Sequence, residues 1–192
     1  MRVETPRLLI RDLETTDRPA VEAWRADPDV MRYLDSRAAG VDDWLDRALQ
    51  RNVAKPRLYH DCAIELKPGA SSEDTGRGDR ERGEVVGWIS LGHAPNFLTT
   101  DWVVGYLLRR EYWGRGYATE ALTAVLDYGF DVLKVPRIYA ECYVANTASA
   151  RVMERAGMRF VGRVPSLDPS LGESVRYLVS RDERSRSADR EG

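Results

Sequence analysis

Cysteine, histidine and lysine are scarce in this sequence. Its 192 residues include two cysteines, two histidines and, among 29 basic side chains, three lysines. Two cysteines make no disulfide framework, and Cys62 and Cys142 lie in apolar, strand-like stretches, so each is expected to be a buried, reduced thiol. A reducing cytoplasm fits this pattern. His60 and His93 have no cysteine or carboxylate cluster at ligand spacing, which predicts no metal site.

Long apolar runs and an excess of positive charge are also missing. No run approaches the roughly 18 residues that span a bilayer, and residues 1–10 carry only Leu8, Leu9 and Ile10 where a signal peptide needs a longer apolar core. We therefore expect neither a membrane protein nor one exported by that route. The 29 basic and 31 acidic side chains leave a net charge of −2. This argues against a nucleic-acid-binding protein, because phosphate binding requires a concentrated basic face.

The composition that is present, 43% hydrophobic and 31% charged, describes a single soluble domain, which we assign to residues 1–180. Residues 68–83 are rich in glycine, serine and charge and predict a mobile loop between two strands, whereas residues 181–192 predict a disordered tail. Residue patterning predicts seven strands: Leu8–Leu13, Leu58–Leu66, Val85–Leu91, Trp102–Leu108, Ile138–Val144, Phe160–Val164 and Val175–Val179. It predicts helical segments at Arg18–Ala26, Val30–Leu34, Val41–Val53, Gly114–Leu133 and Thr147–Ala156.

The fourth strand, the long helix after it and the fifth strand form one βαβ unit. The other strands follow one another mostly without crossover helices. An α/β fold with a mixed, mostly antiparallel sheet of about seven strands and helices on its faces is therefore expected.

The turn into the long helix carries the clearest chemical signal. Gly114, Gly116 and Ala118 leave the backbone unshielded where the first helical N–H groups lack partners, which favours a phosphate site. The alternative is a tight turn that uses glycine for its geometry alone. A Walker A loop is disfavoured because no Gly-Lys pair exists. A dinucleotide fingerprint is disfavoured because Thr119 takes its last position and several strands precede the turn, although Glu141 imitates the acid that binds a ribose.

Three segments together resemble one known family. They are TPRLLIRDL from Thr5, VGYLLRREYWGRGYATEAL from Val104 and NTASARVMERAGMRFVGR from Asn146. This order is similar to the GNAT N-acetyltransferases, and within them to the branch of ribosomal-protein N-terminal acetyltransferases and their relatives that acetylate small molecules. The resemblance implies acetyl-CoA as the acetyl donor and a sheet splayed between the fourth and fifth predicted strands.

The resemblance also implies which residues bind acetyl-CoA. The pantetheine arm would lie along the backbone of the fourth strand, at Tyr106, Leu107, Leu108 and Arg109. The pyrophosphate would meet the amides of Gly114, Arg115, Gly116, Tyr117, Ala118 and Thr119. Arginines that could serve the phosphates, each with the alternative of a solvated surface position, are Arg109, Arg110, Arg115, Arg151 and Arg155.

Catalysis needs a neutral amine, a stabilised oxyanion and a donor to the departing thiolate. By resemblance, Asn146 binds the pantetheine arm, Ser149 is the acid near the thiol, and the backbone N–H of Leu107 or its neighbour stabilises the oxyanion. Asn146 as a plain helix cap and Ser149 as a small polar residue of the first turn are the structural alternatives.

The general base is where the pattern departs from the family. Many relatives carry a glutamate at the position of Val103. Asp101 would face the same side of a regular strand, and Glu141 and His93 are further candidates. Deprotonation through ordered water, without a dedicated side chain, remains open.

These observations predict an amine N-acetyltransferase in which the amine attacks acetyl-CoA directly in a ternary complex. A non-catalytic acyl-CoA sensor is the alternative. The sequence does not choose between a peptide N-terminus and a small-molecule amine. The sequence does not determine the oligomeric state; a homodimer is one possibility, since dimers are common in similar proteins. Aromatic and polar residues expected around the acceptor, with core packing as the alternative, are Trp24, Tyr33, Trp44, Asn96, Phe97 and Trp102.

Overall fold

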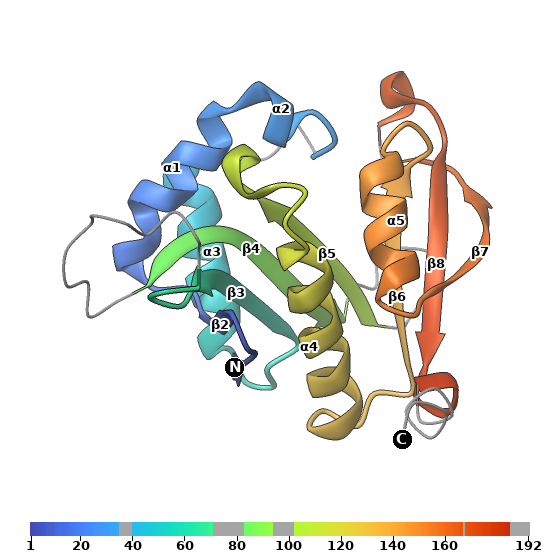
Figure 1. Cartoon of the computed structure of the whole chain (residues 1–192), viewed down its shortest axis with the longest axis horizontal. Helices are drawn as coiled ribbons and strands as arrows, with labels where there is room; N and C mark the ends of the chain where they lie inside the picture. The colour runs from blue at the N-terminus through green and yellow to red at the C-terminus, as the bar shows by residue number, and fades with distance from the viewer. Residues whose placement is uncertain (35–39, 71–82, 94–101, 167, 185–192) are drawn as a thin grey trace.

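The fold is built on one eight-stranded sheet in the order β1-β2-β3-β4-β5-β6-β8-β7 (Figure 1). The structure, a computed structural model, describes residues 1–34, 40–70, 83–93, 102–166 and 168–184. Neighbouring strands are antiparallel except β5 and β6, which are parallel. The strands are β1 Arg2–Glu4, β2 Leu8–Asp12, β3 Tyr59–Leu66, β4 Glu84–His93, β5 Trp102–Leu108, β6 Arg137–Tyr143, β7 Arg159–Val164 and β8 Ser174–Ser180.

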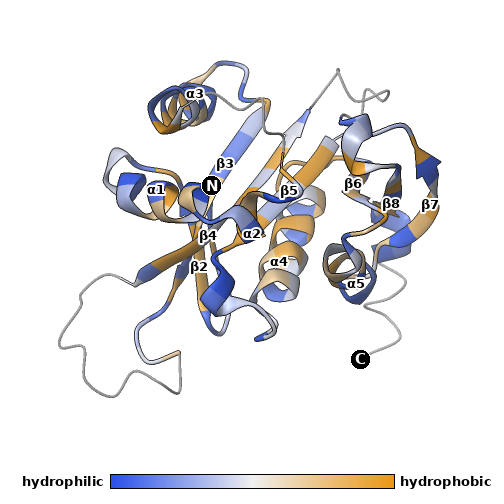
Figure 2. Ribbon diagram, turned by 90° about the horizontal axis from the view of Figure 1, so that it is seen from above, coloured by the Kyte–Doolittle hydropathy of each residue, from blue (hydrophilic) through white to orange (hydrophobic). Residues whose placement is uncertain are grey.

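Helices cover both faces of the sheet, as Figure 2 shows from above. The α-helices are α1 Arg18–Ala26, α2 Pro28–Met31, α3 Val41–Val53, α4 Tyr117–Asp131 and α5 Thr147–Arg155, with short 3-10 turns η1 Thr15–Asp17, η2 Arg110–Tyr112 and η3 Pro169–Leu171. The helices α4 and α5 pack on one face over the larger core cluster, which includes Leu122, Leu126 and Met153. The helices α1 and α3 pack on the other face around Trp24, Leu45 and Leu107. The α/β class with a mixed sheet is confirmed.

Two predictions about the elements need correction. An eighth strand, β1, precedes the first predicted one; it has only three residues and is held against β2 partly by the Met1 amino group, 2.6 Å from the Asp12 carboxylate. The helical turn expected at Val30–Leu34 begins earlier, at Pro28, because the Asp27 side chain caps it by accepting from the Asp29 N–H. The remaining predicted strands and helices lie within a few residues of those observed.

The tail expected to be disordered begins with structure. Residues 181–184 are helical, and the Arg184 guanidinium contacts the Asp127 carboxylate at 2.8 Å and the Ala156 carbonyl at 2.9 Å. These long-range contacts order a segment whose composition alone predicts disorder. Residues 185–192 and the core of the predicted loop, residues 71–82, lie outside the described residues.

The parallel strands β5 and β6 separate soon after they meet. They pair only at Trp102 with Ile138 and at Val103 with Tyr139, and beyond these pairs β5 continues to Leu108 without β6 beside it. The expected splay of the sheet is therefore confirmed. It leaves backbone groups of β5 without strand partners and places a gap between the two halves of the sheet.

Both cysteines are buried and free, as expected. Burial raises the pKa of Cys62 and raises that of Cys142 to about 11, so both remain thiols at neutral pH. Within the described ranges, no group of three or more potential metal-ligating side chains occurs. No helix in those ranges is long and apolar enough to cross a membrane.

A buried histidine predicts how stability depends on pH. His60 is 4% exposed and packs between Trp102 and Tyr128, and burial, with Arg57 nearby, lowers its pKa to about 4. Unfolded histidine titrates near 6.5, so between about pH 6.5 and 4 only the unfolded chain takes up this proton. We expect His60 to lower the free energy of unfolding by up to about 1.4 kcal/mol for each pH unit of acidification in that window.

Urea denaturation of the wild type and of His60→Phe at pH 7, 6 and 5 measures this slope. The variant should lose less stability on acidification. Burial raises the pKa of Asp61, which makes the folded state more stable on acidification and so opposes the effect of His60. Asp61 is present in both the wild type and His60→Phe, so it does not account for a difference between them. Parallel pH profiles for the two proteins would contradict the assignment.

Candidate active site

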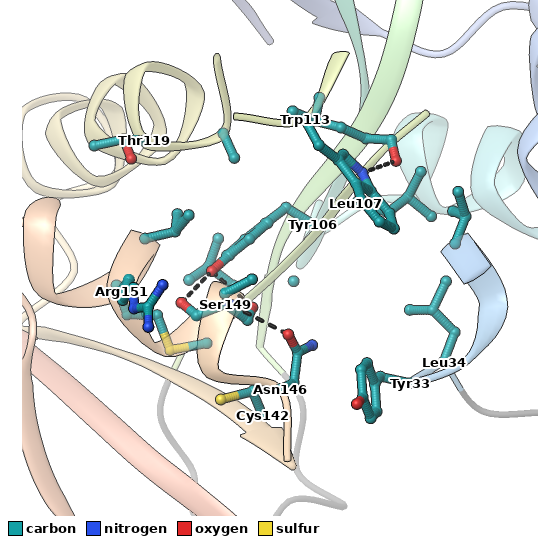
Figure 3. Close-up of a pocket in the computed structure, with 18 of the residues that line it drawn as sticks. Tyr33, Leu34, Tyr106, Leu107, Trp113, Thr119, Cys142, Asn146, Ser149 and Arg151 are labelled. Carbon is teal, nitrogen blue, oxygen red and sulfur yellow. Dashed lines mark hydrogen bonds between the residues drawn. The ribbon is translucent and has the colours of Figure 1, made fainter. Parts of the chain in front are cut away.

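The splay between β5 and β6 opens into a cavity of about 760 Å³. Its walls come from α2 and the residues after it, from β5, from the turn before α4, from β6 and from α5. Figure 3 shows Tyr106 and Leu107 of β5 facing Asn146 and Ser149 of α5 across this space. The cavity therefore joins the segments that the sequence singled out, although they are far apart along the chain.

The glycine-rich turn has the backbone geometry that an anion site needs. Gly114 has φ 74° and Gly116 φ 81°, a left-handed conformation that favours glycine. Gly116 is the N-cap of α4, and its carbonyl oxygen accepts from the Glu120 N–H at 3.0 Å. The N–H groups before Glu120 at the start of the helix are therefore outside the helical ladder, where the helix dipole favours an anion.

The N-terminal segment braces this turn. Arg7 Nε contacts Glu120 Oε2 at 2.7 Å, and Arg7 Nη1 donates to the Arg115 carbonyl oxygen at 3.0 Å. Thr5 Oγ1 also donates to Glu120 Oε1 at 2.5 Å, and the Arg7 guanidinium lies 4.5 Å from the centre of the Tyr117 ring. These contacts hold the first turn of α4 and the glycine turn against β2.

Only part of the β5 backbone faces the gap. Arg109 N–H donates to the Val86 carbonyl oxygen of the β4 segment at 2.8 Å. Because opposed residues of antiparallel strands alternate between bonded and non-bonded pairs, Leu107 directs its N–H and C=O toward β4. Tyr106 and Leu108 direct theirs into the gap. The Leu108 carbonyl already accepts from Trp113 Nε1 at 2.8 Å. The N–H of Leu107, one expected oxyanion donor, therefore points away from the gap. The N–H groups of its neighbours Tyr106 and Leu108 point into the gap.

Asn146, Ser149 and Tyr106 form one hydrogen-bonded group. Asn146 caps α5 by accepting the Ser149 N–H at 3.2 Å, so the capping alternative holds. The Ser149 hydroxyl donates to the Tyr106 hydroxyl at 2.9 Å, and the Tyr106 hydroxyl donates to the Ser149 carbonyl at 3.1 Å (Figure 3). Burial raises the pKa of Tyr106, so the phenol keeps its proton. The sequence indicated the backbone of Tyr106 but not this side-chain contact.

The candidate phosphate-binding arginines separate into two groups. Arg151 and Arg155, four positions apart on α5, line the cavity, and Arg151 lies on the same side of it as Thr119 (Figure 3). Arg109 and Arg110 are instead ion-paired, Arg109 with Glu84 and Glu111, Arg110 with Asp27 and Asp29, and neither lines the cavity.

Arg115 does not line the cavity either, and its guanidinium lies 5.9 Å from the Tyr112 ring. The side chains of Arg109 and Arg115 thus do not line the expected cofactor site.

The predicted bases have different positions. Glu141 lines the cavity, but its carboxylate is held by Arg176 at 2.5 Å, a cross-strand partner on β8. Asp101 lies outside the described residues, as do Asn96 and Phe97. His93 pairs with Trp102 at the end of β4, and it is not among the lining residues.

The cavity wall opposite α4 is mostly aromatic and apolar. Tyr33 packs on Tyr143 with ring centres 6.1 Å apart, and its hydroxyl donates to the Ala145 carbonyl at 3.4 Å. Leu34 and Val103 also line the cavity. Trp24 and Trp44, expected near the acceptor, belong instead to the core under α1 and α3, and Trp102 does not line the cavity.

The splayed mixed sheet, the left-handed glycine turn before a crossover helix and the cavity between them agree with the acetyltransferase class that the sequence resembles. The sequence profile of the Acetyltransferase (GNAT) domain matches residues 7–159, and the chain belongs to this family. It is 30% identical over 168 residues to the uncharacterized N-acetyltransferase YnaD of Bacillus subtilis (strain 168), covering 84% of this chain and 85% of that protein.

Solved structures agree with this family. A GNAT-family acetyltransferase from Bacillus anthracis is similar with a TM-score of 0.74 and 29% identity, over 95% of this chain and 99% of that one. The spermidine N-acetyltransferase from Vibrio cholerae, solved in complex with CoA and spermine, has a TM-score of 0.72 at 16% identity, over 93% of this chain and 98% of that one. The second likeness shows the shared fold only.

Proposed function

We propose that this protein transfers the acetyl group of acetyl-CoA to a primary amine, by direct attack of the amine on the thioester. The observation that carries the proposal is the cavity between β5 and β6, into which the glycine turn, the unpaired backbone of β5 and the Ser149 hydroxyl all open. The CoA complex of the spermidine acetyltransferase of the same fold supports the choice of donor.

The donor site uses backbone and cationic groups. The pyrophosphate binds at the amides between Gly114 and Thr119, with Arg151 and Arg155 as counter-charges from α5. The pantetheine arm pairs with the gap-facing groups of Tyr106 and supplies the strand partner that β6 does not. A gap-facing N–H of β5 stabilises the oxyanion.

The acceptor enters from the opposite wall, between Tyr33 and Val103. The carboxylates of Asp29 and Glu141, which line the cavity, are both bound to arginines, Asp29 to Arg32 and Glu141 to Arg176. With Val103 in place of the family's common glutamate, proton removal from the amine through ordered water is the simpler arrangement, and Asp101 stays a prediction. The acceptor can be a peptide N-terminus or a small molecule.

Direct attack is favoured because neither cysteine is a thiolate at neutral pH. Cys142 lines the cavity, but its pKa of about 11 leaves it a thiol at neutral pH, and Cys62 is fully buried. A thiolate is the form that attacks a thioester, so a covalent acyl-cysteine step is disfavoured. Ser149 then serves as the donor to the departing CoA sulfur.

Release of free CoA thiol from acetyl-CoA, measured with a panel of amines and N-terminal peptides, tests the proposal. We expect release that depends on an amine and matches the amount of acetylated product. Tight acetyl-CoA binding without release for any acceptor would instead support an acyl-CoA sensor. Kinship with the ribosomal-protein N-terminal acetyltransferases stays a prediction, and the oligomeric state stays open.

A further inference from the structure

Tyr106 reaches from β5 to α5 across the gap and contacts Ser149 twice. Its hydroxyl accepts the Ser149 Oγ proton at 2.9 Å and donates its own proton to the Ser149 carbonyl oxygen at 3.1 Å. In Figure 3 both bonds converge on the end of the Tyr106 side chain, beside the cavity. Two hydrogen bonds between the same residue pair specify a position more tightly than one.

Ser149 is thereby held at three of its polar groups. Asn146 accepts its N–H at 3.2 Å, while Tyr106 engages its hydroxyl and its carbonyl oxygen. A serine hydroxyl at the start of a helix can otherwise rotate among several staggered positions. Here the contact with Tyr106 selects one position and keeps Oγ at the cavity wall.

We propose that Tyr106 is a positioning residue for Ser149, whose hydroxyl it orients toward the departing CoA sulfur and supports with a second hydrogen bond. This inference rests on the proposed acetyl transfer. By the family resemblance, the residue that assists the departing sulfur is Ser149 on α5 alone. The inference adds Tyr106 of β5 to it.

The step can be written with its atoms and charges balanced. The amine nitrogen bonds to the carbonyl carbon, the C–S bond breaks, and its electron pair stays on sulfur. The Ser149 O–H turns from Tyr106 to the sulfur, and the Tyr106 O–H turns from the Ser149 carbonyl to Ser149 Oγ. The amine nitrogen loses its proton to solvent, and the released thiolate takes up one from solvent.

Neither hydroxyl needs to lose its proton in this scheme. A thiol is a stronger acid than a phenol, and burial raises the pKa of Tyr106 further. The pair therefore acts as a chain of hydrogen-bond donors to a developing anion, and such bonds to charged groups contribute more than neutral ones.

The test is a double-mutant cycle of Tyr106→Phe and Ser149→Ala in the full chain. Phenylalanine keeps the ring and removes only the hydroxyl. We expect kcat of Tyr106→Phe to fall about tenfold, the loss of one hydrogen bond to a charged group. The KM for acetyl-CoA and its Kd by calorimetry should change less than about twofold, because the bond forms in the transition state. The double variant should be no slower than Ser149→Ala, since Tyr106 acts through Ser149.

Tyr177→Phe is the matched control. The Tyr177 hydroxyl also joins the sheet to α5, through Glu154 at 2.9 Å, but it does not line the cavity. It should retain wild-type kcat, which separates loss of helix docking from loss of Ser149 orientation.

Three results would overturn the inference. They are an unchanged kcat for Tyr106→Phe, losses that multiply in the double variant, and an equal fall in kcat for Tyr177→Phe. A wild-type chain that binds acetyl-CoA yet acetylates no amine would overturn the proposed function and this inference together. An active wild type with an unaffected Tyr106→Phe would overturn only the inference.

Discussion

Replacement of Gly116 by glutamate should weaken acetyl-CoA binding by at least about 100-fold, or about 2.7 kcal/mol. Gly116 has φ 81°, where a side chain costs roughly 1–2 kcal/mol. A Cβ there would also lie 3.4 Å from Arg7 Nη2, which braces the turn. The glutamate carboxylate would add a negative charge where the amides of α4 are expected to receive the pyrophosphate. Titration calorimetry with acetyl-CoA measures the loss.

Gly162→Glu is the control for this variant. It introduces the same charge at a position on β7 where a Cβ meets nothing within 4 Å and where φ is not left-handed. Its acetyl-CoA affinity should equal that of the wild type. Thermal denaturation of both variants shows whether the fold persists. If Gly116→Glu folds and still binds acetyl-CoA normally, the glycine turn is not the phosphate site.

Ser149→Ala should lower kcat about 100-fold, at the lower end of what removal of one preorganised hydrogen-bond donor to a developing anion costs. The Kd for acetyl-CoA should change less than about threefold, because the capping bond uses the backbone N–H of Ser149 and remains in alanine. Stopped-flow detection of CoA thiol release at saturating acetyl-CoA measures the chemical step directly.

Ser149→Thr is the matched variant, since it keeps a hydroxyl on the same backbone position. It should recover much of the lost rate. An equal loss of affinity and turnover in Ser149→Ala would make Ser149 a contact for the bound cofactor rather than the donor to the leaving sulfur.

Local features of the sequence predicted most of the fold. The apolar spacing of α4 and α3, the β5 strand and the order of the other strands depend on residues within one element, so a short window contains the signal. The polar edge strand β1 was missed because it has three residues and no apolar alternation. The helical start of the tail was missed because composition alone reveals neither the capping contacts between Ser180 and Glu183 nor those of Arg184 with residues 28 and 57 positions away.

Part of the candidate site was predicted because its signals are also local. Gly114, Gly116 and the Asn146 cap are recognisable because their roles depend on neighbouring backbone. Glu141 looked like a free carboxylate because its partner, Arg176, lies on β8 and is adjacent only through strand pairing. Trp24 and Trp44 looked like pocket residues because composition does not tell which side of a helix faces a cavity.

By itself, therefore, the sequence determined the element order, the glycine turn and the resemblance to acetyltransferases, since these rest on spacing along the chain. The tertiary structure alone decided that Arg7 braces the glycine turn and that Tyr106 bonds to Ser149. Arg7 is 113 positions from Glu120, and Tyr106 is 43 positions from Ser149. Contacts at such separations form only when the sheet brings distant strands and helices together, and no local pattern encodes them.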